Sequence, residues 1–189
     1  MIISCVYDKE DEFIYYPVTK VCIHSITYHA LKDRAVVYSR DPILWQEKCE
    51  LVKVENLFKM AFVRNPFDRA VSAFLYLQRQ KIILKEWDFS GYIIHMHEEN
   101  KELDHHFNLQ TLGFEVASLD FLGKFESLQT DWQIVARKLS VPEELGQFNQ
   151  TKRELNSVAS YYTEKVRDLI IDRYELDFEL LKYSLCLPE

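Results

Sequence analysis

The sequence predicts an α/β fold in a single domain, with a central parallel sheet flanked by helices. Short apolar segments alternate with segments of helical periodicity, which is the pattern of repeated strand–helix–strand units. The chain has 189 residues, of which 48% are hydrophobic, and this is enough for one core. It contains only four glycines and five prolines, and no linker, low-complexity segment or internal repeat is visible. Residues 1–189 are therefore expected to form one domain.

Four short apolar segments are expected to be strands. They are residues 13–18 (FIYYPV, ended by Pro17), 35–39 (AVVYS), 58–63 (FKMAFV) and 119–125 (LDFLGKF). Each is rich in aromatic or aliphatic residues and too short for a typical helix. The segment 58–63 is the clearest central strand.

The segments between and after these strands are expected to be helical. The predicted helices are 25–34 with Ser25 as its cap, a turn from Asp41-Pro42, 66 to about 81, 89–99, 131–139, 161–174 and 177–183. Pro66 suits the first position of its helix, where the missing N–H has no partner to lose. Ser140-Val141-Pro142 is expected to end the helix before it.

Composition excludes several classes of function. The net charge of −7 and pI of about 5.4 argue against a protein that binds nucleic acid or an anionic membrane. The four cysteines show no CxxC pair or metal spacing, which is typical of reduced thiols. The apolar N-terminal run is too short for a signal segment, and no run reaches the ~20 apolar residues of a membrane span. A cytoplasmic protein is expected.

The segment after the first predicted strand has the layout of a phosphate-binding loop. Lys20 follows the strand, and Ser25 stands at the start of the next predicted helix. The N–H groups of a helix N-terminus attract an oxyanion, to which the lysine adds a full charge and the serine a hydroxyl donor. The P-loop consensus GxxxxGK[ST] is absent. Taken alone, the segment is more simply an ordinary turn with a surface lysine and a capping serine.

The segment after the strand at 58–63 is more specific. Arg64 stands where the strand ends, and Ser72 follows eight residues later, two turns into the predicted helix. A guanidinium and a hydroxyl placed in this way can hold one phosphate from two sides. Arg69 is a second cation and is expected to pair with a carboxylate inside the fold. The structural alternative is a salt bridge at Arg64 and a Ser72 that only fills the helix.

With both segments in view, the chain resembles the sulfotransferases that use 3'-phosphoadenosine 5'-phosphosulfate (PAPS), in particular the branch that includes carbohydrate sulfotransferases. Those proteins hold the 5'-phosphosulfate with a P-K-x-x-x-[ST]-S loop and the 3'-phosphate with an R-[DN]-P-[FY]-x-R-x-x-S element. The second element is present in full as Arg64, Asn65, Pro66, Phe67, Arg69 and Ser72. The first is represented by Lys20 and Ser25.

Further similarities follow in the order of the family, so that the resemblance covers roughly residues 12–184. Residues 106–110 (HFNLQ) are similar to H-[FW]-x-P-Q, and 121–131 (FLGKFESLQTD) to F-[IL]-G-[KR]-[FY]-E-x-L with a later Asp. Residues 149–153 (NQTKR) resemble the N-x-[ST] loop that folds over the nucleotide. The terminal helix pattern is matched by Tyr161-Tyr162, Tyr174 and Asp177-Phe178.

The first loop departs from the family pattern. It contains no glycine, Thr19 replaces the usual proline, and Ile23-His24 stand where small residues and a threonine are usual. A loop that closes around phosphate favours small residues, because backbone N–H groups must approach the anion. His24 either donates a hydrogen bond in place of the missing hydroxyl or points away.

The resemblance implies a P-loop-like sulfotransferase fold, PAPS as co-substrate and no metal ion. By the same resemblance, Lys20 stabilises the leaving 5'-phosphate, helped by Ser25 and His24, and Arg64 and Ser72 hold the 3'-phosphate. The residues expected to close the site are Thr151, Lys152 and Arg153.

A general base is expected to take the proton of the acceptor hydroxyl. His106 is the first candidate because it occupies the H-[FW] position, and His24 and Glu126 are weaker ones. Lys20 and His106 are therefore the predicted catalytic residues.

The predicted function is sulfuryl transfer from PAPS to an acceptor hydroxyl, on a small molecule or a carbohydrate, without a nucleic-acid or membrane partner. One alternative is a catalytically impaired homologue that still binds PAPS or its product, PAP, and a weaker one is a small-molecule kinase of P-loop type. A metal site formed by His95, His97, His105 and His106 with neighbouring acids is disfavoured, because the spacing is loose. The sequence identifies neither the acceptor nor the oligomeric state.

Overall fold

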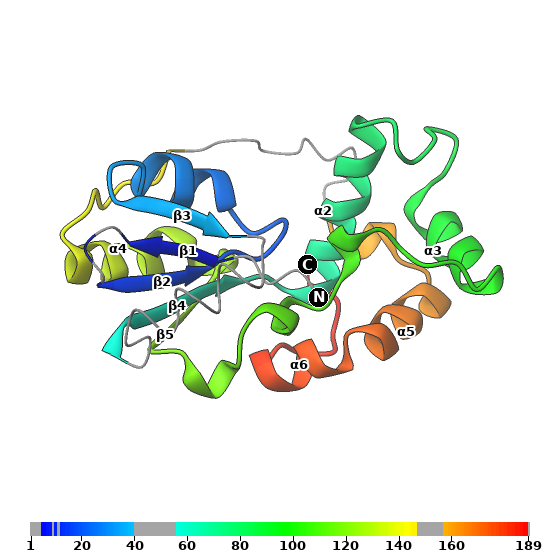
Figure 1. Ribbon diagram of the computed structural model, residues 1–189. Coiled ribbons are helices and arrows are strands. Elements are labelled where there is room, and N and C mark those ends of the chain that lie inside the picture. The colour runs from blue at the N-terminus through cyan, green and yellow to red at the C-terminus, as the bar shows by residue number, and fades with distance from the viewer. Residues whose placement is uncertain (1–4, 9, 11, 40–55, 147–156, 189) are drawn as a thin grey trace. The chain divides into compact units, whose positions relative to one another are not determined.

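The computed structural model describes residues 5–8, 10, 12–39, 56–146 and 157–188. Contacts group the chain into two compact units (Figure 1). The sheet unit contains residues 1–63 and 110–149, and the helical unit contains residues 64–109 and 150–189. That residues 1–189 form one domain stays a prediction. The predicted helical turn at Asp41-Pro42 lies outside the described residues.

The sheet unit is built on five strands in the order β3-β1-β2-β4-β5 (Figure 1). The strands are β1 (Cys5–Asp8), β2 (Phe13–Tyr16), β3 (Ala35–Ser39), β4 (Phe58–Val63) and β5 (Phe121–Lys124). All four predicted strands are present, and β2, β4 and β5 run parallel as expected. The α/β fold class is confirmed.

Strand β1 was not predicted, and it makes the sheet mixed. It pairs antiparallel with both β2 and β3. Only residues 9–12 separate β1 from β2, which is too short a connection for the crossover that parallel pairing requires. The parallel sheet expected from the sequence is therefore interrupted by one antiparallel strand, β1, which lies between β3 and β2.

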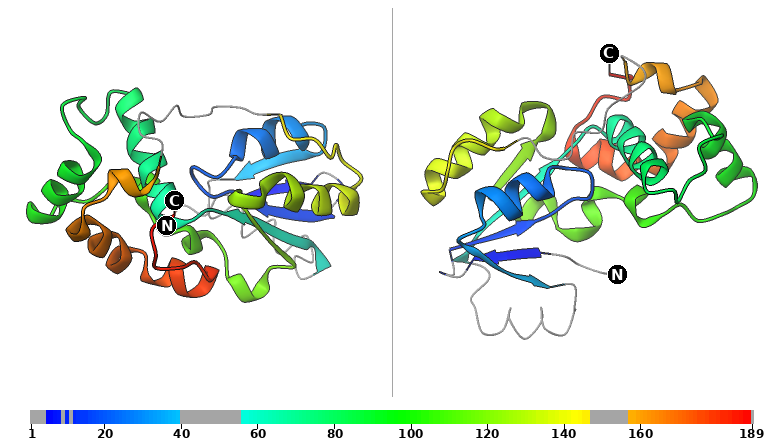
Figure 2. Two further views of the ribbon diagram at one scale, coloured as in Figure 1. Left: turned by 180° about the vertical axis from the view of Figure 1, so that it is seen from behind. Right: turned by 90° about the horizontal axis from the view of Figure 1, so that it is seen from above.

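Two helices lie on the same face of this sheet (Figure 2). They are the π-helix η1 (His24–Ala30) and α4 (Leu128–Leu139). Trp132 of α4 packs on Phe62 of β4, with ring centroids 6.2 Å apart. Helix α4 begins three residues before the predicted start and ends as predicted at Leu139, which Ser140 follows in the left-handed conformation. The short 3-10 turns of this unit are η4 (Gln110–Gly113), η5 (Val116–Ser118) and η6 (Phe125–Ser127).

The helical unit has an aromatic core. Its elements are α2 (Pro66–Arg79), α3 (Phe89–Glu98), η3 (His105–Phe107), η7 (Ala159–Tyr161), α5 (Glu164–Arg173) and α6 (Glu175–Leu181). The ring of Phe67 lies 4.9 Å from that of Phe178, and the ring of Phe74 lies 5.6 Å from that of Phe89. The buried side of α2 includes the predicted apolar positions at Phe67, Val71, Phe74 and Leu77. Helix α2 thus packs into the core of the helical unit through the apolar face that the sequence predicts.

The two C-terminal helices begin at other residues than expected. Helix α5 begins at Glu164, because the hydroxyl of Thr163 accepts a hydrogen bond from the N–H of Val166 at 3.3 Å and caps the helix there. Helix α6 begins at Glu175 and ends at Leu181, two residues earlier at each end than predicted. No helix in the described ranges is long and apolar enough to cross a membrane.

Candidate functional site

The first predicted loop, residues 18–25, belongs to the sheet unit and turns tightly between β2 and η1. Val18 and Val21 are buried, and the N–H of Val21 donates to the carbonyl oxygen of Val18 at 3.1 Å. Lys20 and Cys22 have φ angles of 67° and 40°. A non-glycine residue in this left-handed region is strained by about 1–2 kcal/mol. The loop therefore adopts, without a glycine, a backbone conformation in which glycine is favoured.

The prediction that Ser25 caps the following helix is wrong. The residue at the cap position is Ile23, which makes no side-chain cap bond, and η1 begins at His24. Ser25 is consequently already inside the first turn, where its side chain is buried. His24 is exposed, and its ring lies 5.3 Å from that of Tyr28, one turn later. Lys20 is half-buried.

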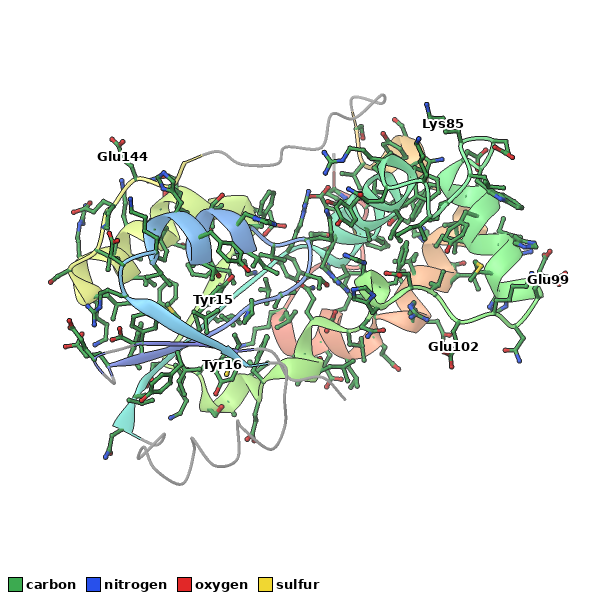
Figure 3. The ribbon with its side chains drawn as sticks, turned by 45° about the horizontal axis from the view of Figure 1, so that its top comes forward. Tyr15, Tyr16, Lys85, Glu99, Glu102 and Glu144 are labelled. Atoms are coloured by element: carbon green, nitrogen blue, oxygen red, sulfur yellow. The ribbon has the colours of Figure 1, made fainter. Side chains whose placement is uncertain are left out.

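The hydroxyl groups of Tyr15 and Thr27 are buried in the two segments that flank this loop. Tyr15 and Tyr16 are consecutive in β2 (Figure 3), and their rings contact Phe62 at 6.4 Å and Phe114 at 6.0 Å respectively. The hydroxyls of Tyr15 and, in η1, of Thr27 have no hydrogen-bond partner among the described residues. Burial raises the pKa of the Tyr15 hydroxyl well above its usual value, and the nearby Cys22 adds to the shift. Both hydroxyls are thus neutral groups that retain hydrogen-bonding capacity.

The second predicted element opens α2 in the helical unit. Oδ1 of Asn65 accepts hydrogen bonds from the N–H groups of Phe67 at 3.0 Å and Asp68 at 3.4 Å, so this residue caps the helix. Pro66 occupies the first helical position, as predicted. Nε of Arg64 donates to Oδ2 of Asp68 at 2.7 Å. This charge-assisted bond orients the guanidinium of Arg64 at the start of the helix.

The two arginines of this element have different surroundings. Arg69 is 1% exposed, and its guanidinium donates to the carbonyl oxygens of His106 at 3.1 Å and Asn108 at 2.5 Å. It also lies 3.9 Å from Oδ2 of the buried Asp177. The expected pairing of Arg69 with an internal carboxylate is confirmed. Ser72 lies further along the helix and is buried.

Two tyrosines of the C-terminal pattern bond to backbone carbonyl groups of other motifs in the helical unit. The hydroxyl of Tyr162 donates to the carbonyl oxygen of Phe67, and that of Tyr174 to the carbonyl oxygen of Phe107, both at 2.8 Å. Burial raises the pKa of both hydroxyls, so they remain protonated donors. Sequence reasoning placed these tyrosines in a family pattern and missed that they fix backbone carbonyls of the other motifs.

His106, the predicted base, lies in η3. Its ring Nδ1 is 2.6 Å from Oδ1 of Asp104, and its ring centroid is 5.0 Å from that of Tyr76. The ring of His105 lies beside it in a tilted arrangement, with centroids 4.1 Å apart. Asp104, His105 and His106 place possible ligand atoms within 4.8 Å of one another. Oδ1 of Asp104 contacts Nδ1 of both histidines. The expectation of a site without metal stays a prediction.

The segment after β5 has a structural role in the sheet unit. Oδ2 of Asp131 accepts hydrogen bonds from the N–H of Lys124 and the hydroxyl of Ser127, both at 2.7 Å. Asp131 thereby ties the end of β5 to the start of α4. Glu126, the weaker base candidate, is exposed. Thr151, Lys152 and Arg153 lie outside the described residues.

Comparison with known proteins bears on these motifs. The sequence profile described as the Sulfotransferase family matches residues 4–184. The chain belongs to the sulfotransferase family. A sulfotransferase from Alicyclobacillus acidocaldarius has a solved structure that is similar to this one, with 18% sequence identity and a TM-score of 0.42. The match covers 72% of this chain and 57% of that one, so the chain spans little more than half of that protein. No curated protein matches the chain.

Proposed function

We propose that this sulfotransferase moves the sulfuryl group of PAPS to a hydroxyl group of a carbohydrate acceptor. Membership of the family supports sulfuryl transfer in general, over residues 4–184. What we propose beyond family membership is that PAPS is the donor and that a carbohydrate hydroxyl group is the acceptor. In the reaction, the acceptor oxygen bonds to sulfur, the bond from sulfur to the 5'-phosphate oxygen breaks, and PAP leaves.

The observation that carries the choice of PAPS is the position of Arg64 beside the capped N-terminus of α2. Arg69 serves the fold, since its guanidinium is used by two carbonyl oxygens and Asp177. Arg64 stands at the start of a capped helix, and its Nε donates to Asp68. A phosphate is favoured at a helix N-terminus beside a fixed guanidinium. Arg64 and Ser72 are thus assigned to the 3'-phosphate, which PAPS has and ATP lacks.

In the sheet unit, Lys20 is assigned to the 5' end of the donor. Its charge stabilises the negative charge that develops on the leaving phosphate. Ser25, His24 and the backbone of the loop add hydrogen-bond donors there. The positive φ angles of Lys20 and Cys22 support this role, because anion-binding loops contain residues in the left-handed region. Thr151, Lys152 and Arg153 are proposed to complete donor binding.

The acceptor proton needs a base, and His106 is assigned to it. Its ring is partly exposed and lies in a fixed turn of the helical unit. A positioned base of this kind contributes about 100-fold or more to the rate. The reaction is then balanced: the acceptor loses its proton to His106, and the sulfuryl group replaces that proton on oxygen.

Calorimetric titration with PAP, beside 5'-AMP and ATP, tests the donor. PAP is expected to bind at least about tenfold more tightly than 5'-AMP, a difference of ~1.4 kcal/mol. Arg64→Ala is expected to remove this preference. Arg79→Ala is the matched control, because Arg79 lies exposed at the far end of the same helix. Equal affinity for PAP and 5'-AMP would contradict the proposal.

The same titrations separate the alternatives. Tight PAP binding without transfer to any acceptor would favour the catalytically impaired homologue, which the glycine-free loop suggests. Stronger binding of ATP than of PAP would favour a kinase. Lys20→Ala distinguishes a catalytic lysine from a surface lysine: we expect it to abolish transfer while the protein remains folded, as judged by circular dichroism.

A further inference from the structure

The imidazole of His106 is held from several directions within the helical unit. Oδ1 of Asp104 accepts a hydrogen bond from the backbone N–H of His106 at 2.9 Å and lies 2.6 Å from its ring Nδ1. Arg69 donates to the carbonyl oxygen of His106, and the ring of Tyr76 packs on the imidazole. The backbone and the ring of His106 are therefore both fixed relative to one carboxylate.

The contact between Asp104 and Nδ1 determines the tautomer. An ionised carboxylate only accepts hydrogen bonds, so a contact of 2.6 Å requires a proton on Nδ1. In the neutral ring the lone pair then lies on Nε2. Burial alone would raise the pKa of the Asp104 carboxyl, but the backbone and side-chain hydrogen bonds of His106 outweigh it and lower this pKa. Asp104 therefore remains the acceptor at neutral pH.

We infer that Asp104 is a positioning residue for the proposed sulfuryl transfer. It holds His106 with its proton on Nδ1, so that Nε2 is the atom that takes the proton from the hydroxyl group of the sulfuryl acceptor. The inference rests on the proposed function, because that function makes His106 the base. Asp104 keeps its own charge throughout and stabilises the imidazolium that forms, as the aspartate does in the triad of serine proteases.

The other charged and titratable groups around this pair define the controls. His105 shares the carboxylate, since its Nδ1 lies 3.2 Å from the same Oδ1, but its side chain is 67% exposed. Tyr92 of α3 has a pKa raised by burial and then by the charge of Asp104. Tyr76 and Arg69 face the pair from α2. Of these groups, His105 alone is exposed and adjacent, so His105→Gln is the matched control.

Proton–nitrogen NMR of labelled imidazole rings tests the tautomer without any activity. In the wild type at alkaline pH, His106 is expected to carry its proton on Nδ1, and His105→Gln is expected to leave this unchanged. Asp104→Asn is expected to weaken the tautomer preference and to lower the pKa of His106, because the stabilising charge is lost. A wild-type proton on Nε2, or an unchanged titration in Asp104→Asn, overturns the inference.

Initial rates of transfer test the role in the reaction. Radiolabelled PAPS is the donor, and a panel of chemically desulfated glycosaminoglycans supplies the acceptor. Asp104→Asn is expected to lower kcat by about ten- to a hundredfold and to shift the acid limb of kcat/KM to lower pH, with PAP affinity unchanged. His105→Gln is expected to stay within about twofold of the wild type.

The possible failures are distinguishable. An Asp104→Asn variant that is as fast as an active wild type overturns the positioning role and leaves the proposed function intact. A wild type without transfer to any member of the panel contradicts the proposed function, and the role of Asp104 in catalysis falls with it. Because Asn retains a side-chain acceptor for the N–H of His106, Asp104→Asn is expected to fold, and its circular dichroism spectrum checks this.

Discussion

The two segments assigned to the two ends of PAPS are stabilised in different ways. The loop at 18–25 holds Lys20 and Cys22 at positive φ and leads into a helix without a side-chain cap. The element at 64–72 contains no residue of positive φ, and Asn65 caps its helix with two hydrogen bonds. One segment is thus strained and held by its surroundings, while the other is stabilised by its own side chains.

This difference shows which residues determine the conformation of each segment. The capped helix start depends on residues within three positions of one another, and any chain with Asn65 and Pro66 in this order favours it. The strained loop depends on Val18 and Val21, which are buried in the sheet unit and hold the turn from both sides of Lys20. Substitutions are therefore expected to act locally in the second segment and through the core in the first.

The largest expected effect on stability comes from removing the buried side chain that supports the second segment. Arg69→Ala removes a buried guanidinium from two carbonyl oxygens and leaves the charge of Asp177 buried. We expect a loss of about 3–5 kcal/mol in the free energy of unfolding, measured in urea. Arg79→Ala on the same helix should change it by less than about 0.5 kcal/mol. A loss below about 1 kcal/mol for Arg69→Ala would show that the internal pair is unimportant.

The next effect concerns the sheet beside the first segment. Gly123 of β5 lies opposite Phe62 of β4, and a Cβ there would overlap the phenylalanine ring. That ring is enclosed by Phe121 and Trp132, so it has little room to move. Gly123→Ala is expected to destabilise the protein by about 1–3 kcal/mol in thermal or urea unfolding. Gly113→Ala, where a Cβ meets nothing within 4 Å, is the control, and equal losses in the two variants would be inconsistent with the clash.

A pair of substitutions at Cys22 measures the strain of the first segment. Cys22→Val places a β-branched side chain at a φ of 40° and is expected to lose about 1–2 kcal/mol of stability. Cys22→Gly removes the strain and is expected to be tolerated, because the relief offsets the greater flexibility of the unfolded chain. If Cys22→Gly were the more harmful of the two in urea unfolding, the positive φ would not matter.

The smallest effect compares the two helix starts directly. Asn65→Ala removes the acceptor of two N–H groups and is expected to lose about 1 kcal/mol. Ser25→Ala removes no cap and should stay within about 0.5 kcal/mol. Both are measured by urea unfolding. Similar losses would mean that Ser25 supports its helix after all.

The sequence predicts the locally stabilised segment better than the strained one. The strand at 58–63 and the helix at 66 were predicted correctly, because an apolar run and a proline give local signals. The inward role of Arg69 was also predicted correctly. Ser25 was misassigned, because capping depends on where the first turn begins, and here a π-helix starts one residue before it. Strand β1 has only four residues and no turn signal that distinguishes it from a tail.

The contacts that join distant motifs were not predictable. Asp104 stands two residues before His106, which was the available signal, but only the fold of η3 shows that one carboxylate oxygen reaches both the backbone and the ring. The hydroxyls of Tyr162 and Tyr174 bond to carbonyl groups that lie 95 and 67 residues earlier in the chain. No local pattern encodes such a pairing.

The hydrogen bond from Tyr162 to Phe67 also bears on the order of events during synthesis. Domains form as the chain leaves the ribosome from its N-terminus, and a contact across 95 residues is slow to close. A nascent chain that ends before Tyr162 contains all of α2 and its Asn65 cap but lacks the donor that fixes the carbonyl group of Phe67 in its first turn. The helix start assigned to the 3'-phosphate is therefore completed late, after all five strands of the sheet have been made.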